Sequence, residues 1–66
     1  MNIVAKAHEL TYSTSYPLNS GRSTTAFAHG ALAALEGKPS TPHGGKIREA
    51  AYKAGYEAGL EAKEAN

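Results

Sequence analysis

The same twelve-residue pattern occurs twice in this chain of 66 residues, and it strongly limits the folds that the chain can adopt. Residues 26–37 and residues 51–62 align at an offset of 25, and both begin with alanine followed by an aromatic residue. Glycine then stands at equivalent places, as Gly30 and Gly55, and leucine follows each glycine five positions later. Both copies are rich in helix-forming residues, so the pattern predicts two short, similar helices.

Glycine inside both copies needs an explanation, because it costs a helix about 1 kcal/mol relative to alanine. Residues four positions apart share one face of a helix, so small residues form one ridge on each predicted helix. Such ridges let two backbones approach closely, and we expect them to form the seam between the helices. The alternative is that the glycines admit a ligand or the backbone of a partner. The predicted packing residues are Ala26, Gly30, Ala34, Ala51, Gly55 and Gly59.

The residues around the two copies predict where the helices begin and end. The first helix should start after one of the hydroxyl residues at 23–25, acting as N-cap, and should stop at Gly37. Two prolines and two glycines within residues 38–45 exclude a continuous helix. The second helix should run from about residue 46 to residue 62 or beyond. The expected fold class is therefore mainly α, with a closely packed helical hairpin built from the internal repeat.

Residues 1–25 lack a clear period and are interpreted as an N-terminal arm. The apolar residues within 1–10 fit neither period well, which leaves a short strand and a frayed helix both open, and we interpret the segment as an irregular or short-strand arm. Residues 11–25 are rich in Ser, Thr and Tyr and contain a turn signal. The predicted organisation is a single domain, with the arm at 1–25 and the helical hairpin at 26–66. Exposed small ridges on such a hairpin would also allow a homodimer.

Charge is unevenly distributed along the chain, although the formal net charge is only +1. Residues 38–48 contain Lys38, His43, Lys46 and Arg48 before the first acidic residue of the second helix, whereas the end of the chain is rich in glutamate. Free backbone N–H groups at the start of the second helix, together with Lys46 and Arg48, would suit an anion. The alternatives are a flexible hinge capped by water and an ordinary solvated helix face.

No set of residues with catalytic spacing occurs in the sequence. The chain has no cysteine and no aspartate, and its three histidines lack metal-ligand spacing. Residues 44–46 resemble the end of a phosphate loop, but isoleucine follows the lysine where Ser or Thr is required. We therefore expect a protein without enzymatic activity, bound metal or cofactor.

Membrane insertion is not expected from the hydropathy of the sequence. No apolar run approaches the ~20 residues that a membrane-spanning helix needs, and the first residues lack a basic leader. The expected location is the cytoplasm. A chain of this size leaves much of its surface in water, so a binding partner would help to stabilise it.

In both copies of the repeat, alanine, an aromatic residue and glycine recur in short helices around a proline-containing loop, most clearly at residues 51–59. Over about residues 26–62, this pattern resembles the ribosome modulation factor family. Members of that family are small two-helix bacterial proteins that bind the small ribosomal subunit near the messenger exit region and promote inactive ribosome dimers. The resemblance implies a ribosome or rRNA partner. The corresponding candidate residues are Arg22, Lys38, His43, Lys46 and Arg48 for phosphate, and Tyr12 and Tyr16 for base stacking.

A second hypothesis comes from the small size, the lack of catalytic groups and the near-neutral charge. These features are typical of small inhibitors that phages and mobile elements encode against a host protein complex, for instance one acting in defence or transcription. Purification from the host separates the two hypotheses. Ribosomal particles would support the first, and one stoichiometric protein partner would support the second.

Overall fold

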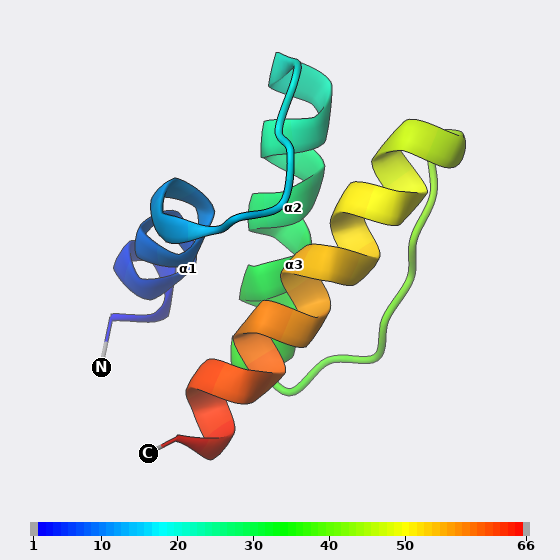
Figure 1. The fold of residues 1–66 in the computed structure, drawn as a ribbon. Coiled ribbons are helices and arrows are strands. Elements are labelled where there is room, and N and C mark those ends of the chain that lie inside the picture. Colours follow the sequence, from blue (N-terminus) through cyan, green and yellow to red (C-terminus); the bar gives the residue numbers. More distant parts are fainter. Residues whose placement is uncertain (1, 66) are drawn as a thin grey trace.

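The computed structural model describes residues 2–65, which form three helices (Figure 1). Helix α1 is Ile3–Ser13, α2 is Gly21–Leu35 and α3 is Lys46–Glu64. No strand occurs among the described residues, so the prediction of a mainly α fold is confirmed. Helices α2 and α3 form the main packing interface, and α1 packs chiefly against α2.

Helix α1 occupies the segment for which we expected an irregular arm or a short strand, so that prediction is wrong for residues 3–13. Asn2 caps the helix, because its side-chain oxygen accepts two backbone N–H groups of the first turn, each at 3.1 Å. Ala7 is buried in a cluster with residues of α2. The hydroxyl of Thr11, also buried, donates to the carbonyl of Ala7 at 2.8 Å. Burial of one face therefore stabilises a helix whose sequence period is weak.

Helix α2 begins one turn earlier than predicted. Ser20 is the N-cap, and its hydroxyl oxygen accepts the backbone N–H of Ser23 at 3.2 Å. In return, the hydroxyl oxygen of Ser23 accepts the backbone N–H of Ser20 at 3.2 Å. The predicted start after residues 23–25 is wrong because Ser23 occupies the third helical position of this capping box, rather than the cap itself.

The end of α2 agrees with the prediction that Gly37 follows the helix as its C′ residue. Gly37 has a φ of 77°, a conformation that glycine adopts readily. Its N–H donates to the carbonyl of Ala34 at 3.0 Å, and the N–H of Lys38 donates to that of Ala33 at 2.9 Å. These two bonds form a Schellman motif, which satisfies the last carbonyl groups of the helix. The predicted range of the following helix, from residue 46 to beyond residue 62, is also confirmed.

Helices α2 and α3 lie side by side and run in the same direction, so the predicted hairpin is wrong (Figure 1). The contacts show the same order along both helices, with Gly30 against Tyr52 and Ala31 against Gly59. The connection, residues 36–45, returns along the helix pair to the level at which α2 begins. Helix α2 has 15 residues and is about 22 Å long. Ten extended residues reach about 33 Å, which is enough to make this return.

The three glycines inside the helices lie where the two backbones meet. A Cβ atom on Gly30 would overlap the carbonyl oxygen of Tyr52, and one on Gly55 would overlap the carbonyl oxygen of Phe27. On Gly59 it would lie 2.6 Å from a carbonyl oxygen of α2. This close approach explains glycine at these positions despite its cost to the helices. All six predicted ridge residues are buried, so the exposed ridges that suggested a homodimer are not present.

Two tyrosines of α3 attach the connection to the helix pair. The hydroxyl of Tyr56 donates to the carbonyl of Lys38, and the hydroxyl of Tyr52 lies 3.5 Å from that of Thr41. The two rings stack with their centroids 6.5 Å apart. These contacts hold residues 38–41 of the connection against α3.

Candidate nucleic-acid interface

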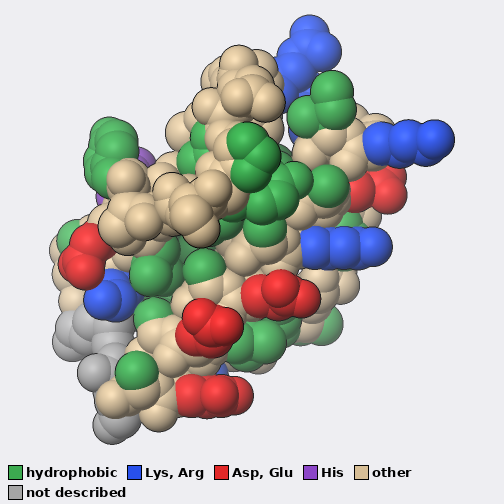
Figure 2. Space-filling model, viewed as in Figure 1, with side chains coloured by type: hydrophobic (Ala, Val, Ile, Leu, Met, Phe, Trp, Pro, Cys, Tyr) green, Lys and Arg blue, Asp and Glu red, His purple; other side chains and the backbone are tan. Residues whose placement is uncertain are grey.

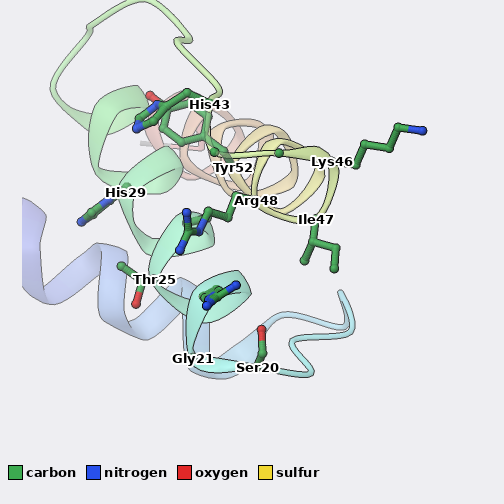
Figure 3. Close-up of a pocket in the computed structure, with 13 residues that line it drawn as sticks. Ser20, Gly21, Thr25, His29, His43, Lys46, Ile47, Arg48 and Tyr52 are labelled. Atoms are coloured by element: carbon green, nitrogen blue, oxygen red, sulfur yellow. The ribbon is translucent and has the colours of Figure 1, made fainter.

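The starts of α2 and α3 lie at the same end of the molecule and enclose an open groove (Figure 3). The wall on the α2 side contains Ser20, Gly21, Arg22, Thr25, Ala26 and His29. The wall on the α3 side contains His43, Gly44, Gly45, Lys46, Ile47, Arg48 and Tyr52. No acidic side chain is among these lining residues. Because the helices are parallel, the positive ends of both helix dipoles also lie at this groove.

The cations of the groove differ in direction. Arg48 extends into the groove toward α2, whereas Lys46 points away from it into solvent (Figure 3). Arg22, Lys46 and Arg48 are all exposed, and within residues 2–65 none of them forms an ion pair or a side-chain hydrogen bond. A guanidinium without a carboxylate partner keeps its N–H donors for a ligand. The two arginines can therefore bind an anion in the groove, and Lys46 adds positive charge at its edge.

The backbone at the start of α3 also offers donors to an anion. Gly44 and Gly45 have φ values of 94° and 97°, in the region that favours glycine. Gly45 is the N-cap and has no side chain with which to cap the helix, whereas Asn2 and Ser20 cap the other two helices. The first N–H groups of α3 are therefore open to a ligand or to water. A Cβ on Gly44 would lie 2.6 Å from Cδ of Arg48, so glycine also leaves room for that side chain.

Two of the predicted binding residues lie elsewhere. Lys38 follows the end of α2, at the opposite end of the helix pair, and its Nζ pairs with a carboxylate oxygen of Glu36 at 3.6 Å. Tyr16 is half-buried, and its ring packs on Phe27 with the centroids 6.2 Å apart. Neither residue faces the groove. The predicted residues that the structure does bring together there are Arg22, His43, Lys46 and Arg48.

A second, mainly apolar groove lies between α1 and α2, and it contains the remaining predicted residue, Tyr12. Its lining is Val4, Ala7, His8, Tyr12, Thr24, Thr25, Ala28, His29 and Leu32. Tyr12 is 86% exposed and stacks on His8 with the ring centroids 6.5 Å apart. Thr25 and His29 line both grooves, so the two grooves meet on the surface of α2.

Thr25 and His29 line the groove, although the sequence alone indicates only a candidate helix cap at Thr25 and a histidine without metal-ligand spacing at His29. Thr25 lies three positions after Arg22, and His29 lies seven positions after it. This spacing places all three residues on one face of a helix. This signal becomes visible only when the helix is known to start at Gly21.

The opposite end of α3 is acidic. Glu57, Glu61 and Glu64 are exposed there, and acidic side chains gather over this part of the helix (Figure 2). The molecule therefore has a basic end, where the groove lies, and an acidic end. Such a separation of charge orients a polyanion toward the groove and away from the rest of α3.

No known family matches this chain, and no curated protein and no solved structure is significantly similar to it. Within residues 2–65, none of the helices has both the length and the apolar character that crossing a membrane requires. The chemical class of the ligand is therefore inferred from the grooves themselves.

Proposed function

We propose that this chain is a non-enzymatic RNA-binding protein that acts on the ribosome in the cytoplasm, with the basic groove as its binding site. The observation that carries the proposal is the parallel packing of α2 and α3. It places Arg22 in the same groove as His43 and Arg48, although these residues are far apart in the sequence. Arginine binds phosphate through paired hydrogen bonds, and phosphate contacts supply most of the sequence-independent affinity for nucleic acids.

The ribosome is proposed as the source of the RNA because the repeat resembles the ribosome modulation factor family. With a net charge of +1, affinity must come from the few cations at the groove rather than from a broad positive field. Three cations on a single strand predict a slope of about −2 when the logarithm of the binding constant is plotted against that of the salt concentration. Binding should therefore weaken about 16-fold when the salt concentration is raised fourfold.

The parallel packing itself is proposed to come from the internal repeat. Gly30 lies against Tyr52, and Gly55 lies against Phe27. The repeat offset of 25 makes Phe27 equivalent to Tyr52 and Gly30 equivalent to Gly55. Exchanging equivalent residues therefore converts one contact into the other. Two equivalent helices around a twofold axis make such reciprocal contacts, as identical subunits do in a symmetric dimer.

Binding to a host protein complex, as an inhibitor from a phage or mobile element would do, is the second candidate. It is favoured by large apolar side chains in solvent, with Val4 51%, Ile47 71% and Tyr12 86% exposed. Aromatic residues are enriched in protein interfaces. In this case the exposed apolar residues, rather than the arginines, would provide the affinity.

Co-sedimentation with ribosomes at about 50 mM and about 200 mM salt tests the proposed function. We expect the protein to pellet with ribosomes at the lower salt and to be largely released at the higher, because its phosphate contacts compete with cations. Absence from the ribosome pellet at both salt concentrations would refute the proposal. Affinity purification from the host then addresses the second candidate, which predicts one stoichiometric protein partner in place of ribosomal particles.

A further inference from the structure

Tyr12 is the most exposed large hydrophobic residue within residues 2–65, and it does not belong to the hydrophobic core. The residue is 86% exposed, and its hydroxyl has no hydrogen-bond partner among the described residues. The ring of His8, one turn earlier and also exposed, stacks on it at an interplanar angle of 26°. The packing of α1 instead depends on Ala7 and its buried neighbours. The two rings therefore form an aromatic surface that is available to a ligand.

This aromatic surface is continuous with the basic groove. Thr25 and His29 line both grooves, so the groove that holds the Tyr12–His8 pair meets the groove that holds the arginines on the surface of α2. The width of a helix with its side chains is about 10 Å, which a short nucleic-acid strand spans. Neither groove has an acidic side chain among its lining residues, which favours a phosphate backbone along this path.

We infer that the ligand is single-stranded RNA, which crosses α2 with its phosphates at Arg22 and Arg48 and a base stacked on Tyr12. This inference rests on the proposed function and specifies the form of RNA that the same site accepts. Proteins that bind single strands combine a positively charged groove with aromatic side chains on which bases stack. This chain has both features side by side.

A duplex would not use the aromatic surface. In double-stranded RNA the bases are paired and stacked on one another, and a protein contacts mainly phosphates and 2′-hydroxyl groups. A duplex could therefore occupy the basic groove but would gain nothing from Tyr12. The contribution of Tyr12 distinguishes the two forms of RNA.

Fluorescence anisotropy with the full chain tests the inference. The probes are a labelled single-stranded RNA of about 12 nucleotides, within the site sizes of single-strand-binding folds, and a blunt-ended RNA duplex of about 12 base pairs, which has no unpaired base. Tyr12→Ala should weaken single-strand binding by about 5-fold to 150-fold and leave duplex binding unchanged. Tyr12→Phe keeps the ring and should retain single-strand affinity within about twofold. Tyr12 is exposed and alanine favours helix, so the variant should remain folded, which circular dichroism verifies.

The outcomes separate the inference from the proposed function. Equal binding of both RNAs, with no effect of Tyr12→Ala, would overturn the inference and leave the basic groove as a general phosphate site. Binding to neither RNA and not to heparin would overturn both. An equal loss of affinity for both RNAs in a folded Tyr12→Ala variant would also contradict base stacking, because the blunt duplex has no free base for that ring.

Discussion

Replacing Gly55 with alanine should lower the free energy of unfolding by about 2 kcal/mol or more. The added methyl group would overlap the carbonyl oxygen of Phe27 and lie 2.7 Å from its carbonyl carbon, so α2 and α3 must separate. Overpacking of this kind typically costs about 1–3 kcal/mol, and here the obstacle is backbone, which cannot rotate away as a side chain can. The higher helix propensity of alanine returns only about 1 kcal/mol. Because the overlap is with backbone, we expect the cost to reach or exceed the upper end of that range, which leaves a net loss of about 2 kcal/mol or more.

Such a loss is large for a chain of 66 residues, whose total stability is about 3–10 kcal/mol. Gly30→Ala should have a similar effect, because its methyl group would overlap the carbonyl oxygen of Tyr52. Gly21→Ala is the matched control, since a Cβ there has no neighbour within 4 Å. Urea denaturation followed by circular dichroism compares the three variants. Equal stability of Gly55→Ala and Gly21→Ala would show that the helices do not approach each other at Gly55.

Reversing the charge of both arginines in the groove should abolish binding to RNA and to ribosomes while leaving the fold intact. Arg22 and Arg48 are exposed and make no ion pair within residues 2–65, so Arg22→Glu with Arg48→Glu removes no contact that stabilises the structure. Two cations at the phosphates become two anions. We expect affinity to fall by at least about 100-fold at low salt, because loss of each charged contact costs about tenfold and repulsion is added.

The control variant carries the same change of charge at another place. Lys53→Glu with Lys63→Glu also lowers the formal net charge from +1 to −3, but these exposed residues of α3 do not line the groove. We expect this variant to keep its affinity within about threefold, since neither side chain lines the groove and exposed charges that make no direct contact are weakened by salt screening. Similar losses in the two variants would mean that overall charge, and not the groove, determines binding.

Local features of the fold could be predicted from the sequence. The small ridges and the end of α2 at Gly37 follow from residue type and spacing, because the helix face and the Schellman motif depend on neighbours within a few positions. Helix α1 could not be predicted in this way, because it depends on contacts with a distant part of the sequence. Its residues form a helix because Asn2 caps it and Ala7 is buried against α2, and burial by another element leaves little trace in the local sequence.

The direction of α3 could not be predicted, and the site depends on it. A ten-residue connection can close a hairpin or return along the whole helix, and its prolines and glycines are compatible with both paths. The return path separates Lys38 from Arg48, although both belong to one basic stretch of sequence, and brings Arg22 to the groove instead. It also makes site residues of Thr25 and His29, whose role depends on a helix that is distant in sequence.

The distance between spin labels on α2 and α3, measured by double electron–electron resonance, tests the parallel arrangement most directly. The chain has no cysteine, so labels attach only to introduced ones, and Arg22, Ile47 and Glu64 are exposed positions for them. The parallel arrangement predicts that labels at 22 and 47 lie close together, at the end of the molecule that holds the groove. Labels at 22 and 64 should be much farther apart, because α3 has 19 residues and is about 28 Å long. A shorter distance for 22 and 64 than for 22 and 47 would contradict the parallel arrangement, and with it the groove.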